Sequence, residues 1–276
     1  MKELKVFNQI LQMRNFVKDC KKNNFTIGFV PTMGALHDGH LALIKNAQKI
    51  CDIVVVSIFV NKMQFNDIND FENYPRNLDD DIALLKSAQV DALFIPNHAE
   101  IYPDLPSFYI IPVNLVDCLC ASNRQGHFDG VALVITKLFN IVNPDFSFFG
   151  EKDFQQLLVV KKLVEDLNFN TKIIAVPTLR ESSGLAMSSR NKRLSYAGKN
   201  KAAVIFQILK DIKKNPLTIP LKIAELTASG FDKIDYLEIR NESDLNLNYD
   251  INSNQKRRIF IAVYLEGVRL IDNIQL

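Results

Sequence analysis

Strand-like and helix-like segments alternate along most of the chain, and this alternation restricts the possible folds more than any other feature. The strongest strand signal is the run IVVVSIFV at residues 53–60, and shorter apolar runs occupy residues 25–30, 92–95, 145–149 and 172–176. Segments with apolar residues at helical spacing separate them, at residues 40–50, 78–88, 130–142 and 152–167. Strands that are apolar on both faces and joined through helices form parallel sheets by right-handed crossovers. We therefore expect an α/β fold with a doubly wound parallel sheet.

The pattern changes after Pro177. Residues 178–194 are polar, rich in Ser and Arg, and show little periodicity. Two helical segments and two alternating, antiparallel-type strands are then expected at about residues 196–213, 221–229, 233–240 and 257–265. We predict a boundary near residues 177–185, with a sheet domain at residues 1–177 and a smaller C-terminal α+β lid domain at residues 178–276.

The balance of charge limits the possible partners. The chain has 33 Lys plus Arg against 31 Asp plus Glu, so its formal net charge is +2. A near-neutral chain has no electrostatic footprint for nucleic acid, where a basic domain is expected. We therefore expect small-molecule substrates and no nucleic-acid partner, since a local cluster of cations can still hold a small anion.

Cysteines and apolar runs predict a cytoplasmic protein without a membrane segment. The four cysteines, at positions 20, 51, 118 and 120, lack the spacing of zinc ligands and are typical of core residues in a reducing compartment. Residues 1–5 mix both charge signs and lack the apolar core of a signal peptide. The longest apolar run, residues 53–60, is far shorter than the ~20 residues that span a bilayer.

The first candidate site joins the strand at residues 25–30 to the following helix, with the sequence PTMGALHDGH at residues 31–40. Ligands bind beyond the carboxyl ends of strands in open α/β sheets, and a helix start offers free N–H groups to an anion. His37 and His40 are three residues apart, so their imidazoles lie on one side of the turn and can donate to phosphate oxygens. Alone, an HxxH pair is more typical of a surface feature, a helix cap or a weak metal site. Between a buried strand and a helix it indicates a phosphate site.

Two further segments place polar residues after strands. VNKMQFN at residues 60–66 follows the strongest strand, and its amides suit hydroxyl and carboxylate groups. FGEKDFQQ at residues 149–156 joins another strand to a helix. Taken alone, Gln64 would be an ordinary loop residue and the Glu-Lys-Asp cluster a solvated helix start. The recurrence of a polar strand-to-helix junction favours a binding site.

The fourth segment, LRESSGLAMSSRN at residues 179–191, occupies the expected domain junction. The hydroxyls of Ser188 and Ser189 and the guanidinium of Arg190 form a natural grip for the β- and γ-phosphates of a nucleotide. On its own, such a stretch is more typical of a solvated linker. A flexible loop between domains can also close over a nucleotide and exclude water.

These four segments resemble, in the same order, the motifs of the pantoate–β-alanine ligase family, a branch of the HIGH-motif nucleotidylyltransferase superfamily. FGEKDFQQ matches the family's FGEKDxQQ without a gap, and LAMSSRN is similar to its counterpart of the KMSKS loop. Further similarities are YPR at residues 74–76, RQGHFDGV at 124–131 and RLIDN at 269–273. The resemblance covers about residues 25–273 and is weakest over residues 200–255.

The chain departs from the family pattern at a few loop positions. Lys62 and Gln125 stand where proline is usual, Ser182 and Ser183 replace Pro-Asp, and Leu179 replaces valine. We expect these changes to alter the stiffness of the loops and to leave the phosphate contacts in place. His127, within the 124–131 stretch, is as typical of a packed structural residue as of a functional one, so we do not count it as catalytic.

The resemblance implies a Rossmann-like domain that binds ATP and pantoate, and an AMP-forming ligase. Pantoate and ATP would give pantoyl adenylate and pyrophosphate, and β-alanine would then displace AMP to give pantothenate. The implied catalytic residues are His37, His40, Lys152 and Arg190. The implied ATP-binding residues are Met33, Gly34, Ala35, Leu36, His37, Asp38, Gly39, His40, Gly150, Glu151, Lys152, Asp153, Leu179, Met187, Ser188, Ser189 and Arg190. Gln64 and Gln156 would bind pantoate and β-alanine, Mg²⁺ would be held mainly through the ATP phosphates, and the enzyme would be a homodimer.

Another enzyme class remains open from the residues. An adenylyl- or cytidylyltransferase of the same superfamily, acting on a phosphorylated small molecule, shares HxGH but has no need of the paired Gln64 and Gln156. A fragment of an aminoacyl-tRNA synthetase would need a surface for tRNA, which the neutral charge does not support. A metal site at His37 and His40 lacks convincing additional ligands.

Overall fold

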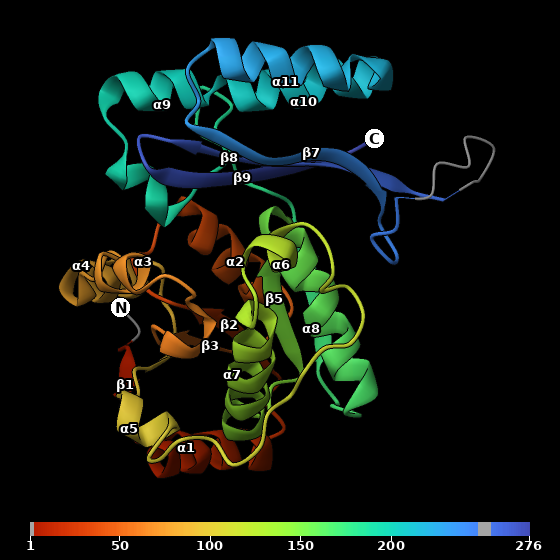
Figure 1. Ribbon diagram of the computed structural model, residues 1–276. Coiled ribbons are helices and arrows are strands. Elements are labelled where there is room, and N and C mark those ends of the chain that lie inside the picture. The colour runs from red at the N-terminus through yellow and green to blue at the C-terminus, as the bar shows by residue number, and fades with distance from the viewer. Residues whose placement is uncertain (1–2, 248–254) are drawn as a thin grey trace.

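A six-stranded parallel sheet lies at the centre of the larger part of the protein (Figure 1). The computed structural model describes residues 3–247 and 255–276. The strands are β1 (Lys5–Phe7), β2 (Ile27–Thr32), β3 (Ile53–Ile58), β4 (Ala92–Phe94), β5 (Phe146–Gly150) and β6 (Lys172–Val176), in the order β1-β4-β3-β2-β5-β6. The predicted parallel sheet is confirmed. β1 was not predicted, because it is a three-residue edge strand with two exposed residues and no recognisable apolar run.

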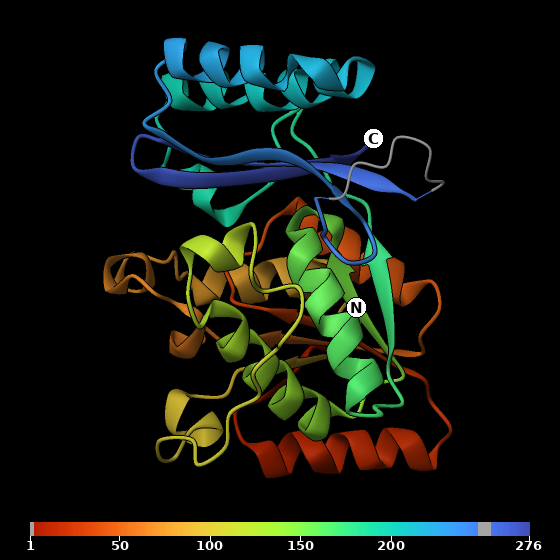
Figure 2. The same ribbon diagram turned by 45° about the vertical axis from the view of Figure 1, so that its right-hand side comes forward.

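Helices cover both faces of this sheet, as a doubly wound fold requires (Figures 1 and 2). They are α1 (Ile10–Lys22), α2 (Asp38–Gln48), α3 (Ile68–Glu72), α4 (Leu78–Ser87), α5 (His98–Ile101), α6 (Cys120–Asn123), α7 (His127–Val142) and α8 (Phe154–Asp166). Successive residues of β2 face opposite sides: Phe29 packs in a core with α1, α7 and α8, while Val30 packs with α2 and α4. The strands are therefore apolar on both faces, which is the pattern that predicted them.

The sheet reverses its winding direction between β2 and β5. From β2 the chain proceeds outward through β3 to β4, and it later returns to place β5 on the other side of β2. The loops that leave β2 and β5 therefore diverge to opposite faces and open a crevice at the carboxyl ends of these strands. Such a switch point is where open α/β sheets bind their ligands.

A second, antiparallel sheet completes the described chain. Its strands are β7 (Lys233–Asn241), β8 (Arg257–Leu265) and β9 (Val268–Gln275), preceded by the helices α9 (Tyr196–Ala202), α10 (Val204–Lys214) and α11 (Ile219–Ala228). Figures 1 and 2 show this sheet lying between those helices and the larger α/β body. The predicted helix at 196–213 is divided at Ala203, and β9 is a third strand that the sequence analysis did not identify.

We propose that the chain divides near residue 177, as the sequence analysis predicted. The last parallel strand ends at Val176, and a separate hydrophobic core joins α10 to the antiparallel sheet through residues such as Ile208, Leu209 and Ile261. We propose that this second layered unit acts as the predicted lid. None of the helices in residues 3–247 and 255–276 is both long enough and apolar enough to cross a membrane.

Candidate active site

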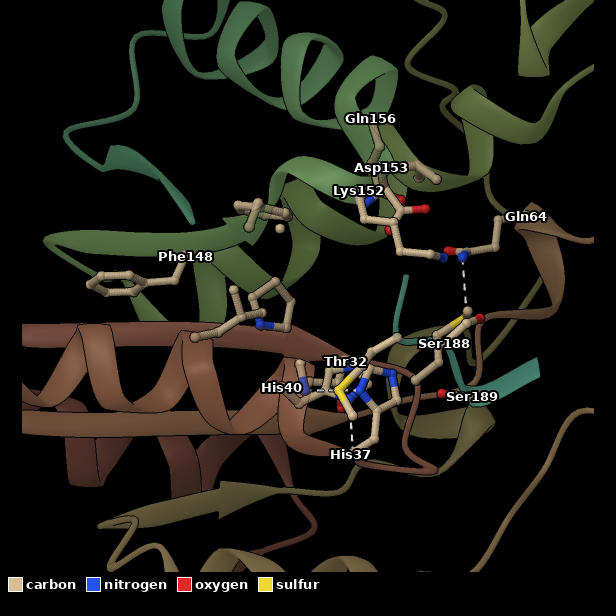
Figure 3. A pocket seen from close by; sticks show the side chains of 18 of the residues that line it. Thr32, His37, His40, Gln64, Phe148, Lys152, Asp153, Gln156, Ser188 and Ser189 are labelled. Carbon is tan, nitrogen blue, oxygen red and sulfur yellow. Dashed lines mark hydrogen bonds between the residues drawn. The ribbon is translucent and has the colours of Figure 1, made fainter. Parts of the chain in front are cut away.

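A cavity of about 220 Å³ lies at the carboxyl ends of β2 and β5, at the switch point of the sheet (Figure 3). All four segments singled out in the sequence contribute to its wall. The predicted residues found there are Met33, His37, Gly39, His40, Gln64, Gly150, Lys152, Asp153, Gln156, Leu179, Met187, Ser188, Ser189 and Arg190. Figure 3 shows the two histidines on one side of the cavity, with Lys152, from the turn before α8, and Gln156, from the first turn of α8, on the other side.

Five other predicted ATP-binding residues are not part of the cavity wall. Gly34, Ala35, Leu36, Asp38 and Glu151 do not line the cavity. Asp38 is exposed in the first turn of α2, and the backbone oxygen of Glu151 faces β9. These residues lie outside the lining of the cavity, and their part in ATP binding stays a prediction.

A buried carboxylate from α4 shapes the loop after β2. Asp81 accepts hydrogen bonds from the backbone N–H groups of Ala35, at 2.9 Å, and Leu36, at 2.7 Å. Gly34 adopts a positive φ of 82°, and a Cβ at this position would lie 3.0 Å from the Asp81 carboxylate. Asp81 thus engages the backbone amides of two residues that were predicted to bind ATP. Sequence reasoning missed Asp81 because it stands in a run of three aspartates, of which Asp79 and Asp80 are exposed.

The two histidines form a capping box at the N-terminus of α2. The His37 Nδ1 accepts from the Gly39 N–H at 3.1 Å, and the His40 Nδ1 lies 3.3 Å from the His37 N–H. Their ring centroids are 4.2 Å apart. A Cβ on Gly39 would lie 2.7 Å from the His37 ring, so this turn requires glycine. Because each Nδ1 is an acceptor, each neutral imidazole carries its proton on Nε2.

Both imidazoles are neutral near pH 7. Burial, followed by the positive charge of Lys152, lowers the pKa of His37 to about 4. Burial, His37 and Lys152 together lower the pKa of His40 to about 3. The pair therefore offers Nε2–H donors to the cavity, while the positive charge of the wall belongs to lysine and arginine side chains.

Lys152 is supported from the antiparallel sheet. It lies in the short 3₁₀ turn η2 (Glu151–Asp153) between β5 and α8. The Asn273 side chain on β9 donates to the backbone oxygens of Glu151 and Lys152, each at 2.9 Å, and accepts from Arg258. Asn273, the last residue of the RLIDN segment, therefore fixes the turn that carries Lys152.

The neighbouring residue of that segment supports the 179–191 loop. Asp272 binds the guanidinium of Arg180 through two hydrogen bonds of 2.6 and 2.9 Å. At the other end of the loop, the Ser189 hydroxyl donates to the Ala35 backbone oxygen at 3.0 Å. The loop is therefore tied both to β9 and to the segment after β2, across the two sheets.

Arg190 has a carboxylate partner from another segment. Its Nη2 lies 2.9 Å from Asp70 on α3, and the Arg193 guanidinium reaches the same carboxylate at 3.0 Å. Burial of Arg190 opposes its charge, but the hydrogen bond and charge of Asp70 leave its pKa raised. Arg190 is thus a cation whose guanidinium is fixed at the cavity wall by Asp70. Asp70 is a second supporting residue that sequence reasoning missed.

The glutamines occupy different surroundings. Gln64 lies in the 3₁₀ turn η1 (Lys62–Gln64) and is buried, with its Nε2 3.1 Å from the Met33 sulfur and its Oε1 accepting from Asn61 at 3.1 Å. Gln156 lines the cavity from the first turn of α8. The structure therefore brings the two amides that were predicted for pantoate to one cavity.

From the sequence, no resident metal ligands were expected, because Mg²⁺ would be held mainly through the ATP phosphates. In the described residues, no group of three or more His, Cys, Asp or Glu side chains is arranged to hold a metal ion. Among the described residues that line the cavity, Asp153 is the one with a carboxylate side chain.

Comparison with known proteins identifies the same family that the motifs suggested. A family model described as pantoate–β-alanine ligase matches residues 5–275. A pantothenate synthetase from Carboxydothermus hydrogenoformans is 43% identical over 279 residues, covering 98% of both chains. One from Acinetobacter baylyi is 47% identical over 258 residues, covering 90% of both chains.

Solved structures agree in fold over the whole chain. Pantothenate synthetase from Thermus thermophilus superposes with a TM-score of 0.90 at 37% identity, covering 98% of this chain and 99% of its own. Pantoate–β-alanine ligase from Francisella tularensis, described as complexed with β,γ-ATP and β-alanine, gives a TM-score of 0.87 at 40% identity, covering 99% and 98%.

Proposed function

The chain belongs to the pantoate–β-alanine ligase family, and on that premise we propose that it condenses pantoate with β-alanine through a pantoyl-adenylate intermediate, using ATP and releasing AMP and pyrophosphate. One observation carries this proposal: loops after β2, β3 and β5 and the 179–191 loop meet at one cavity with neutral donors, cations and amides. The ligands named for the Francisella relative, ATP and β-alanine, are two of the three proposed substrates.

In the first step a carboxylate oxygen of pantoate attacks the α-phosphorus of ATP. The bond between the α-phosphorus and the bridging oxygen breaks, and pyrophosphate leaves with that electron pair. Two anions must approach each other, so catalysis depends on fixed donors and cations around the phosphates. We assign the Nε2–H groups of His37 and His40 and the charges of Lys152 and Arg190 to this task, with Mg²⁺ arriving on the phosphates as part of the substrate.

In the second step the amine of β-alanine displaces AMP. The ammonium group first loses a proton, and its nitrogen then attacks the acyl carbon of the adenylate. The acyl C–O bond breaks, AMP leaves with the electron pair, and the nitrogen releases its second proton as the amide forms. Gln64 and Gln156 would orient pantoate throughout both steps, and the 179–191 loop would keep water from the reactive anhydride.

The alternative of a nucleotidyltransferase acting on a phosphorylated substrate is not retained. The family match extends from residue 5 to residue 275 and so includes the antiparallel sheet as well as the HxGH segment. We further propose that the enzyme acts as a homodimer in the cytoplasm, as the family resemblance and the unpaired cysteines predict.

The neutral histidines predict a pH profile. Adenylation should change less than about twofold between pH 6 and 8, because pKa values of about 4 for His37 and about 3 for His40 leave both imidazoles neutral over this range. Below about pH 5 protonation of His37 should slow the step, since a protonated Nδ1 cannot accept from Gly39. Pantoate-dependent exchange of pyrophosphate into ATP, at saturating Mg²⁺ and without amine, measures this. A sigmoidal profile centred near pH 6.5 would contradict neutral histidines.

The proposed function is tested by identifying the nucleotide product. The protein is incubated with ATP, Mg²⁺, pantoate and β-alanine, and AMP and ADP are separated and quantified, with each substrate omitted in turn. We expect AMP and pantothenate in equal amounts from the full mixture, and pyrophosphate exchange when only β-alanine is omitted. ADP as the product, or no AMP with all substrates present, would overturn the proposal.

A further inference from the structure

A smaller side pocket adjoins the main cavity at the start of α8. Lys152, Asp153 and Gln156 line both cavities, so the two share one wall. The rest of the lining of the side pocket comes from α6, α7 and the turn between them and from the antiparallel sheet, including Cys120, Arg124, His127 and Tyr236. This position is next to the proposed pantoate site and away from the histidines that face the phosphates.

Arg124 brings a positive charge to this pocket without a carboxylate partner. Its Nη2 donates to the Gln64 backbone oxygen at 3.2 Å, and its Nη1 lies 3.2 Å from the His127 Nε2. Within residues 3–247 and 255–276, no Asp or Glu forms an ion pair with it. Burial lowers the pKa of Arg124, the charges of Arg190 and Arg269 lower it further, and the carboxylate charge of Asp70 partly offsets them without a direct ion pair.

His127 fixes the direction of that guanidinium. Its Nδ1 lies 2.7 Å from the Gln64 backbone oxygen, which can only accept, so this nitrogen carries the proton. Burial and then the charge of Arg124 lower the pKa of His127 to about 3, so the ring is neutral and its Nε2 accepts from the arginine. One acceptor on the ring and one on the backbone therefore hold Arg124 in place.

The two hydrogen-bond acceptors of this partly buried guanidinium are both neutral, and other cations lie near it. An anionic ligand stabilises such an arrangement. The phosphates of ATP are assigned to the other side of the cavity, and the carboxylate of pantoate is consumed when the adenylate forms. The carboxylate of β-alanine, by contrast, is unchanged in the product and needs a partner during the second step.

We propose that Arg124 binds the carboxylate of β-alanine in the side pocket and so directs its amine across the shared wall toward the pantoyl carbonyl. This inference rests on the proposed function. It makes Arg124 a specificity-determining residue, because amines of similar length without a carboxylate lose the charge-assisted hydrogen bonds. It also gives His127 a positioning role that acts through Arg124.

The test compares β-alanine with β-alaninamide, which keeps the amine and the length but carries no charge at the far end. In Arg124→Met we expect kcat/KM for β-alanine to fall roughly tenfold to thirtyfold and kcat/KM for the amide to stay within about twofold, so that discrimination between the amines is lost. Arg124→Lys should keep part of the discrimination. Pyrophosphate exchange without amine should stay within about twofold, because His127 still holds the Gln64 backbone.

Arg76→Met is the matched control. Arg76 also donates to two backbone oxygens, those of Phe71 at 2.7 Å and Glu72 at 3.1 Å, but it is exposed and lines neither cavity. Its loss should leave discrimination unchanged. If Arg124→Met and Arg124→Lys discriminate between the amines as the wild type does, or if exchange falls as much as the overall reaction, the assignment is wrong. Failure of the proposed function is distinct, because the wild-type protein would then show no pantoate-dependent exchange.

Discussion

Replacing Lys152 with methionine is expected to slow formation of pantoyl adenylate by about 10²- to 10³-fold, the scale of losing one preorganised donor at a developing charge. Methionine keeps much of the length and the apolar stem, so the change removes mainly the ammonium group. In the described part of the chain Lys152 forms no ion pair, and its charge is already felt at both histidines. The side chain is therefore available to the phosphates without first breaking another contact.

The effect should appear as a loss of kcat in pantoate-dependent pyrophosphate exchange. Lys161→Met is the control, since Lys161 is an exposed lysine on α8 that lies outside the cavity. The Lys152 variant should also show a change that a folding defect would not produce: the pKa of His37 should rise, because the positive charge that helps to lower it is gone. Near-normal exchange in Lys152→Met would remove this residue from the proposed mechanism.

The sequence predicted the sheet and the main site for one physical reason. Strands that are buried on both faces must be apolar throughout, and the polar residues that follow each of them then meet at the same edge of a parallel sheet. This is why His37, Gln64 and Lys152, which are far apart in the sequence, were expected at one place. β1 escaped prediction because an edge strand of three residues needs no continuous apolar run.

The supporting residues were harder to predict because their partners are set by tertiary packing. Asp81 binds amides 45 and 46 residues earlier in the chain, and nothing in a run of aspartates distinguishes the buried one. Asn273 and Asp70 act across 121 and 120 residues on the segments that carry Lys152 and Arg190. Periodicity describes which face of an element is buried; it does not say which loop will lie against its end.

These supports suggest how a protein with a net charge of +2 would hold the highly anionic substrate proposed for it. Charge is concentrated locally, and it is supplied by side chains whose geometry is fixed from elsewhere: Arg190 by Asp70, and the turn of Lys152 by Asn273. The two neutral histidines are proposed to contribute oriented Nε2–H donors and no positive charge. In the proposed mechanism, a site built in this way would place fixed donors at the reacting phosphate without crowding four cations together before the substrate arrives.

Replacing His37 with asparagine should separate the two tasks of this residue. Asparagine is a good N-cap, and its Oδ1 can accept from Gly39 as the imidazole Nδ1 does, so the free energy of unfolding should change by less than about 1 kcal/mol. Its side chain is too short to place a donor where Nε2–H lies. We therefore expect adenylation to fall by about 10²-fold, with His40 remaining as the second donor.

Urea unfolding and pyrophosphate exchange measure these two effects on the same preparation. His98→Asn is the matched control, because His98 is an exposed histidine on α5 that does not line the cavity. If His37→Asn unfolds like the wild type and also exchanges pyrophosphate at a near-normal rate, His37 serves only as the cap of α2. Loss of exchange in a stably folded variant would instead assign the catalytic contribution to the Nε2–H donor, because the cap is the property that asparagine preserves.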